Sequence, residues 1–147
     1  MNKARSKLSL IWEKELGRGG SRITQPRRAI LDIIAESERP LTPQEVYLLA
    51  KVRSPRIGLV TVYRTIEKLE SLGFVDRVHQ TEQCQTVFRG TPEHKHLLVC
   101  ADCGKSVYFN GLDVEEKFLD AGKELGYQIT GHWLQLSGLC PECRNEE

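Results

Sequence analysis

Apolar residues recur at helical spacing through the first seventy positions of the chain, and glycine or proline breaks separate the runs. The first run ends at the glycine-rich stretch 17–20 and contains Leu8, Ile11, Trp12 and Leu16. It predicts a short amphipathic helix that docks on the segments that follow. Basic residues at positions 3, 5 and 7 leave a second interpretation open, a partly ordered basic arm.

Two further helices are predicted from their start signals. Thr24-Gln25-Pro26 places proline near the first turn of a helix, where its missing N–H costs little, and this helix ends by Pro40. Its apolar stripe consists of Ile30, Ile33 and Ile34. Thr42-Pro43-Gln44-Glu45 is a capping box with proline at the first helical position. The helix that begins there is expected to bury Val46, Leu49 and Ala50.

A third helix is predicted over residues 61–72, with Gly73 as its end. Its inward positions are Val62, Ile66 and Leu69, and its opposite face carries Thr61, Tyr63, Arg64 and Lys68. Residues 74–78 and 86–89 are typical of two strands around a polar turn. Three short helices and a β wing predict a winged helix-turn-helix domain over residues 1–90. From these helices alone, DNA binding and an ordinary solvated helix face are equally open.

The pattern changes after Gly90-Thr91-Pro92, which favours a domain boundary there and a second domain over residues 91–147. Residues 97–99 and 106–109 are typical of strands that flank a tight turn.

A helix is then predicted from Asp113, which can cap it, and Glu116 occupies the reciprocal position of a capping box. Its apolar stripe consists of Val114, Phe118, Ala121 and Leu125. After Gly126, residues 127–136 are expected to form a further strand. The second half is therefore predicted to be a small α/β unit, and the whole chain to have an α+β fold.

Charge divides the chain at the same boundary. Residues 1–90 hold 16 Lys and Arg against 10 Asp and Glu, a net +6, whereas residues 91–147 hold 5 against 10, a net −5. The basic half favours a polyanion as partner, although an ordinary solvated surface is the alternative. The apolar run at residues 10–12 is too short for export or for a membrane span, so a cytoplasmic protein is expected.

Two pairs of cysteines give the second half its chemistry. The C-x-x-C turns at Cys100 and Cys103 and at Cys140 and Cys143 are separated by 36 residues. In a reducing compartment such pairs indicate metal more often than disulfides. Four thiolates complete the closed tetrahedron of a structural zinc at ~2.3 Å. The separation exceeds the ~15–20 residues of a compact zinc ribbon, so zinc is expected to staple two ends of a larger unit.

Histidines in front of the first cysteine pair suggest a second site. His94 and His96 are two residues apart, so in an extended segment both rings project to one side. Glu115, in the first turn of the predicted helix, and His132, on the predicted last strand, are the further candidates. Three imidazoles and one carboxylate suit zinc or ferrous iron. Any one of these histidines alone would more often be a surface or hydrogen-bonded residue.

The order of these motifs resembles the ferric uptake regulator family of metal-responsive repressors. The resemblance rests on the segment Gly58-Leu59-Val60-Thr61-Val62-Tyr63-Arg64-Thr65, on His-x-His before Cys-x-x-Cys-Gly, and on the terminal Cys-x-x-Cys, and it extends from Leu8 to Cys143. It implies a winged-helix DNA-binding domain and a β-rich dimerisation domain in a cytoplasmic homodimer. Such a dimer binds palindromic, usually A·T-rich operators when loaded with metal. The resemblance also implies that Tyr63 and Arg64 face the DNA.

The family's metal positions carry over in part. The resemblance puts the structural zinc on the four cysteines and a regulatory metal on His94, His96, Glu115 and His132. A second regulatory site of the family does not carry over. Its usual ligands fall on Gly90, Lys95, Leu97 and Tyr108, none of which is the expected ligand. Only Asp76 remains, and His79 and Cys84 could rebuild the site, although an exposed histidine and an incidental thiol are the favoured interpretation.

The sequence thus predicts a metal-dependent repressor of metal-homeostasis genes that is not an enzyme. Its expected cofactors are a structural zinc and a regulatory divalent metal, zinc, iron or manganese. Its expected partners are a duplex DNA operator and a second copy of the chain, with no membrane. Three alternatives stay open: a peroxide-responsive member of the same family, a zinc-stapled adaptor that never binds DNA, and a zinc hydrolase. The hydrolase is disfavoured because four protein ligands would fill the coordination position that water needs.

Overall fold

The computed structural model describes residues 5–80, 83–90 and 95–144, without the side chains of residues 79–80, 83–86 and 112. The chain divides into two compact units, residues 1–92 and 93–147. Within the described ranges, no helix is both long enough and apolar enough to cross a membrane.

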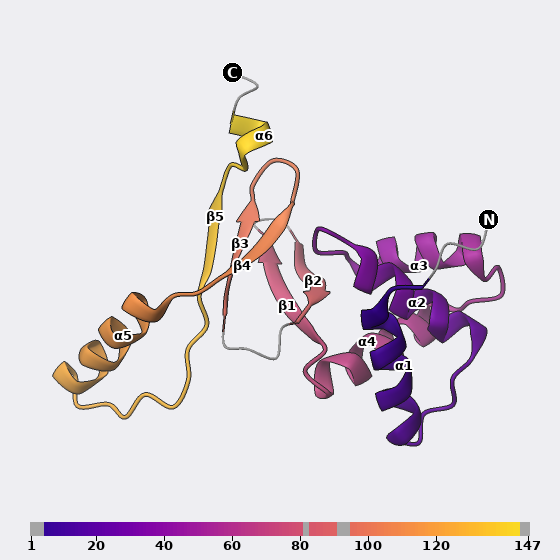
Figure 1. Cartoon of the computed structure of the whole chain (residues 1–147), viewed down its shortest axis with the longest axis horizontal. Coiled ribbons are helices and arrows are strands. Elements are labelled where there is room, and N and C mark those ends of the chain that lie inside the picture. Colours follow the sequence, from indigo (N-terminus) through magenta and orange to yellow (C-terminus); the bar gives the residue numbers. More distant parts are fainter. Residues whose placement is uncertain (1–4, 81–82, 91–94, 145–147) are drawn as a thin grey trace. The chain divides into compact units, whose positions relative to one another are not determined.

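The described part of the first unit contains the helices α1 (Lys7–Arg18), α2 (Gln25–Glu36), α3 (Pro43–Arg53) and α4 (Leu59–Ser71) (Figure 1). The hydroxyls of Ser6, Thr24 and Thr42 each accept a backbone N–H at the start of one of the first three helices. The capping box predicted at Thr42 and Glu45 is confirmed. Side-chain caps of this kind satisfy N–H groups that have no partner within the helix.

The core of this unit is a continuous apolar cluster under the four helices, and its largest fully buried members include Trp12, Leu16, Ile30 and Leu69. The stripes predicted for α2 and α4 are confirmed. Ile11 and Leu49 were expected to be buried, and these predictions are wrong because their side chains are 46% and 48% exposed. Helix α1 buries only the narrow stripe of Ser9, Trp12 and Leu16, which turns Ile11 outward.

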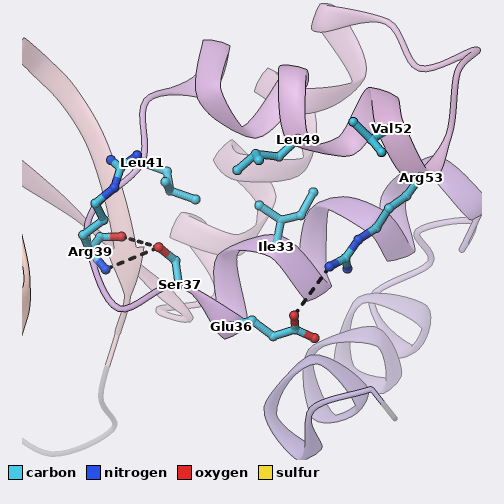
Figure 2. Close-up of a pocket in the computed structure, with 8 residues that line it drawn as sticks. All are labelled: Ile33, Glu36, Ser37, Arg39, Leu41, Leu49, Val52 and Arg53. Carbon is cyan, nitrogen blue, oxygen red and sulfur yellow. Dashed lines mark hydrogen bonds and ion pairs between the residues drawn. The ribbon is translucent and has the colours of Figure 1, made fainter. Parts of the chain in front are cut away.

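Leu49 borders a groove of about 430 Å³ between α2 and α3. Figure 2 shows its lining residues, Ile33, Glu36, Ser37, Arg39, Leu41, Leu49, Val52 and Arg53. An ion pair of 3.5 Å between Arg53 and Glu36 closes one side of the groove (Figure 2). Helix α3 therefore packs through Val46 and Ala50 and leaves its neighbouring apolar face open to solvent.

The wing consists of β1 (Val75–Gln80) and β2 (Gln83–Arg89), which pair antiparallel. Leu41 adds a bridge to Val87 with backbone hydrogen bonds of 2.9 and 2.8 Å, so the wing is tied to the segment between α2 and α3. Val75, Val78, Val87 and Phe88 are buried.

The second unit holds a three-stranded sheet in the order β4-β3-β5. Strands β3 (His96–Cys100) and β4 (Ser106–Phe109) form an antiparallel pair, and β5 (Gln135–Gly138) runs parallel to β3. Helix α5 (Leu112–Glu124) lies between β4 and β5 in the sequence, and the short α6 (Pro141–Arg144) follows β5 (Figure 1).

Two predictions about this unit are wrong. Helix α5 is capped by Gly111, without a side-chain hydrogen bond, instead of by Asp113 and Glu116. The Gly111 carbonyl already accepts the N–H groups of Val114 and Glu115, so Asp113 lies inside the first turn.

The predicted strand over residues 127–136 is regular only from Gln135. Strand β3 begins at His96, and the N–H of Leu97 donates to the Leu134 carbonyl at 3.5 Å, directly before β5 begins. His132 consequently lies in the loop before β5 and not on a strand. The predicted stripe of α5 is only partly covered within one chain, since Val114 and Phe118 are half-buried while Ala121 and Leu125 are exposed.

Candidate metal centres

The four cysteines of the two C-x-x-C turns form one cluster, in which all Sγ atoms lie within 4.8 Å of one another. The Sγ atoms of Cys103 and Cys140 are 3.8 Å apart. A tetrahedron of sulfurs bound at ~2.3 Å has edges of about 3.8 Å, so the cluster matches a zinc site in size. The sequence prediction that these cysteines lie together is supported by this geometry.

The sheet brings the two turns together. Cys100 ends β3 and is the parallel partner of Gly138 at the end of β5, and the N–H of Ala101 donates to the Gly138 carbonyl at 2.7 Å. Gly104 closes the first turn with a φ of 74°, a left-handed conformation that glycine adopts without strain. Residues far apart in the sequence are thus delivered to one end of the sheet.

Backbone N–H groups prepare one thiol of this cluster for ionisation. The N–H of Cys140 donates to the Cys100 sulfur at 3.3 Å, and with the N–H groups of Cys103 and Asp102 it lowers the pKa of Cys100 to about 6. The pKa of Cys143 is raised, because its thiol donates to the Asp102 carboxylate and lies among the other sulfurs. Four sulfurs in so small a volume resist simultaneous ionisation, and a divalent cation removes that conflict.

A second cluster brings together His96, Glu115 and His132, whose ligand atoms also lie within 4.8 Å of one another. The Nε2 atoms of His96 and His132 are 3.0 and 3.2 Å from the same oxygen, Oε1 of Glu115. For ligand bonds of ~2.0–2.1 Å a tetrahedral site has edges of about 3.3 Å, so a small lengthening of these two hydrogen-bonded contacts would admit a metal ion. His94, the fourth predicted ligand, lies outside the described residues.

Three structural segments contribute to this second cluster: the first residue of β3, the first turn of α5 and the loop before β5. Aromatic rings cover two sides of it, with Phe109 centred 5.6 Å from the His96 ring and Phe118 centred 4.9 Å from the His132 ring. The side chain of Glu115 remains 28% exposed, so an ion can reach the carboxylate from solvent. The donor set of imidazole and carboxylate fits zinc or ferrous iron.

Of the residues named as remnants of another regulatory site, only Asp76 has a described side chain. Among the described residues, Asp76 belongs to neither group of candidate ligands, and the side chains of His79 and Cys84 lie outside the description. At position 90 a Cβ atom would lie 2.9 Å from the Gly73 carbonyl oxygen, so a cysteine there would require the backbone to shift. Leu97 is buried in β3.

The predicted DNA-binding face lies on α4. Arg64 is exposed and Thr61, Tyr63 and Lys68 are half-buried, so none of these side chains belongs to the core. The amide of Gln44, at the start of α3, donates to the Tyr63 hydroxyl at 3.4 Å. Sequence reasoning missed Gln44. It also missed Gly111, where an added Cβ would lie 2.6 Å from Nε2 of His96, because that contact joins two separate segments of the chain.

Comparison with known proteins agrees with this arrangement. A family model described as the ferric uptake regulator family matches residues 18–137. The ferric uptake regulation protein of Campylobacter jejuni is 31% identical over 139 residues, covering 92% of this chain and 88% of that protein. The corresponding protein of Escherichia coli K12 is 33% identical over 136 residues, covering 90% of this chain and 91% of its own length.

Solved structures give the same picture of the fold. The Helicobacter pylori ferric uptake regulator superposes with a TM-score of 0.71 at 20% identity over 99% of each chain. A zinc uptake regulator complexed with zinc and DNA superposes with a TM-score of 0.73 at 21% identity over 97% of each chain. The Vibrio cholerae ferric uptake regulator gives 0.65 at 28% identity, covering 87% of this chain and 98% of its own. The predicted α+β fold with an N-terminal winged helix is confirmed.

Proposed function

Because this chain belongs to the ferric uptake regulator family, whose members are transcriptional regulators with metal-dependent DNA binding, we propose that it represses metal-homeostasis genes by binding palindromic operators as a homodimer. Loading of a regulatory metal switches this binding on. The same proposal assigns the protein to the cytoplasm, where its DNA partner lies.

One observation carries the proposal: the ligand atoms of His96, Glu115 and His132 lie within 4.8 Å of one another although they come from three separate segments. A metal held there ties the start of the second unit to α5 and to the loop before β5. His94 would complete the ligand set, and it lies just after residues 90–92, which join the two units in the sequence. Metal loading at this position limits the freedom of the joining segment and so favours one arrangement of the DNA-binding units.

The four cysteines serve a different purpose in this proposal. A closed tetrahedron of thiolates leaves no position for exchange, which is the property of a structural zinc. The site at the histidines has nitrogen and oxygen ligands and partial exposure, which suits an ion that comes and goes. A solved relative from Francisella tularensis is described as containing iron, and another relative as a zinc-bound manganese uptake regulator. For this chain the ligand set supports zinc or ferrous iron, with manganese as a weaker third.

DNA contact is assigned to the face of α4 that carries Thr61, Tyr63, Arg64 and Lys68. The net +6 of residues 1–90 supplies attraction to phosphates, and the exposed Arg64 lies where a base edge or phosphate can be reached. Two copies related by a two-fold axis engage half-sites about one DNA turn apart, ~34 Å. A metal that fixes this spacing raises operator affinity, and the operator raises metal affinity by the same factor.

The test compares His132→Ala with His79→Ala, because His79 is the one histidine outside the proposed sensor. The probe is a DNA duplex selected from a random-sequence pool by the zinc-loaded wild-type protein. The wild type and His79→Ala should bind it about 5–150-fold more tightly when the metal is added. His132→Ala should lose that gain and keep one tightly bound zinc per chain. An unchanged response in His132→Ala would remove this site as the sensor, and a loss in His79→Ala would instead assign the switch to the wing region.

Salt and peroxide separate the remaining alternatives. A repressor that contacts several phosphates loses affinity steeply with added salt, whereas an adaptor shows no duplex binding at any salt concentration. Loss of binding after dilute peroxide, confined to the iron-loaded protein, would assign the peroxide-responsive function.

A further inference from the structure

Gly111 is the N-cap residue of helix α5. Serine, threonine, aspartate and asparagine are preferred at this position because their side chains accept an N–H from the first turn. Helices α1, α2 and α3 follow that preference, whereas Gly111 makes no side-chain hydrogen bond. Glycine is tolerated at such a position, but capping alone does not require it at residue 111.

The conformation of Gly111 does not require glycine either. Its φ of −120° and ψ of 39° lie on the side of the map that any residue can adopt. Gly58, which begins α4 in the same way, has open space where its Cβ would be. A Cβ at Gly111 would lie 2.2 Å from Cδ2 and 2.6 Å from Nε2 of His96, distances that real Cβ atoms do not show.

His96 has little room to yield to such a Cβ. Its side chain is 2% exposed, its ring lies 5.6 Å from that of Phe109 and 5.2 Å from that of His132, and its Nε2 is bonded to Glu115. The edge of the ring that faces Gly111 carries Nε2, the atom that would bind the metal. A methyl group at position 111 would therefore displace the ligand atom itself.

We propose that Gly111 is a positioning residue of the regulatory metal site: by having no side chain, it admits the His96 ring against the start of α5 and fixes Nε2 beside Glu115 and His132. This inference rests on the proposed function, since it deepens the sensor assignment. Helix α5 has no side-chain cap at its N-terminus, and its first turn places the carboxylate of Glu115 beside Nε2 of His96.

The first experiment compares Gly111→Ala with Gly131→Ala. Gly131 directly precedes the ligand His132, yet a Cβ there would meet nothing within 4 Å. Zinc affinity at the second site is measured by competition with a chromophoric chelator, after the cysteine cluster has been filled. Gly111→Ala should bind the second zinc about 10–100-fold more weakly, as for other residues that orient metal ligands, while Gly131→Ala should match the wild type. Equal second-site affinities in the two variants would overturn the inference.

A double-mutant cycle adds a readout that needs no second metal. With only the cysteine cluster loaded, Gly111→Ala should lower the unfolding midpoint of the wild type, because the methyl group and the His96 ring compete for one space. In a His96→Ala background the same change should cost clearly less, because the clash is gone and only the weaker N-capping of alanine relative to glycine remains. An identical shift in both backgrounds would show that Gly111 acts on the backbone alone and would overturn the inference.

The two proposals can fail separately. A wild-type protein that binds a second zinc without any gain in operator affinity would contradict the proposed function, and the Gly111 comparison would still be decided by the chelator assay. A wild-type protein that binds only the cysteine zinc would overturn the inference directly.

Discussion

The two units of this chain bury different kinds of side chain. The interior of the first unit is an apolar cluster that runs from Trp12 through Ile30 to Leu69. Among the side chains that the structure describes in the second unit, half of the buried ones are candidate metal ligands, namely His96, Cys100 and Cys140, and the others are Leu97, Val99 and Ser106. The first unit thus has an apolar core, whereas the interior of the second unit contains candidate metal ligands.

The two units should therefore obtain their stability from different sources. Apolar burial contributes roughly 25 cal/mol per Å² and does so under any metal condition. A domain as short as residues 93–147 buries too little surface to rely on that contribution, and structural metals commonly make up the shortfall. Metal removal should therefore act on one unit, and loss of apolar packing on the other.

The largest effect is expected from Cys103→Ser, which breaks the cysteine cluster. Zinc binding of about 10–16 kcal/mol exceeds the net stability of a small domain, so the second unit should unfold and the dimer dissociate. The helices of the first unit should remain, which far-ultraviolet circular dichroism and size-exclusion chromatography would show together. Cys84→Ser is the matched control, because Cys84 is the one cysteine outside the predicted cluster. A folded, dimeric Cys103→Ser protein would contradict the comparison.

Trp12→Ala should have the next largest effect, and on the other unit. Trp12 is 1% exposed and stacks on Phe74 at 5.9 Å, so its removal should destabilise the first unit by about 3–5 kcal/mol. Trp133 is then the only remaining tryptophan, so its fluorescence follows the second unit in a urea titration while circular dichroism follows the helices.

The control for Trp12→Ala is Ile11→Ala, an adjacent apolar residue that is 46% exposed, and it should change stability by less than about 1 kcal/mol. If the fluorescence and circular dichroism transitions of Trp12→Ala moved to lower urea together, the two units would unfold as one and the comparison would fail.

Local patterns explain how much of the fold could be predicted. A capping box such as that at Thr42 is complete within four residues, and the stripes of α2 and α4 repeat over several turns, so no distant contact is needed to recognise them. Ile11 and Leu49 were mispredicted because an apolar stripe can be wider than the face its neighbours cover. How wide the covered face is depends on tertiary packing, which periodicity does not contain.

The two candidate metal sites also differ in how far local sequence patterns could predict them. Paired C-x-x-C turns predicted a cysteine cluster from spacing alone, whereas His96, Glu115 and His132 were only candidate ligands until the family resemblance favoured their grouping. The start of α5 escaped prediction because the reason for Gly111 lies on another strand, in the ring of His96. The last strand begins at Gln135, opposite Leu97 of β3, and such a register between distant segments is not contained in a local pattern.

The smallest effect is expected from the ion pairs of Glu13, which should contribute to the stability of the first unit alone. Glu13 on α1 accepts hydrogen bonds from Arg5 and from Arg28, the latter at 2.9 Å, and Arg5 also bonds Asp32 on α2 at 2.9 Å. Burial raises the pKa of Glu13, but the hydrogen bonds and positive charges of the two arginines outweigh it, so the pKa lies below its usual value. A carboxylate of this kind stabilises the folded state above the pKa of the unfolded chain, near 4.5, and loses that contribution as pH falls through the lower folded value.

Glu13→Gln should therefore lower the stability of the first unit at pH 7, by only about 1 kcal/mol because the ion pairs are partly exposed and screened by solvent. Below the folded pKa of Glu13 the substitution should leave the stability unchanged, because the carboxyl is then protonated. Urea titrations followed by circular dichroism at several pH values between 3 and 7 would show the two curves converging in acid. Glu15→Gln is the matched control, since Glu15 pairs only across an exposed turn of the same helix with Arg18 and should have the smaller effect. A Glu13→Gln protein whose stability deficit persisted unchanged at pH 3 would assign the role of Glu13 to packing, because a protonated carboxyl and an amide are then nearly equivalent in charge.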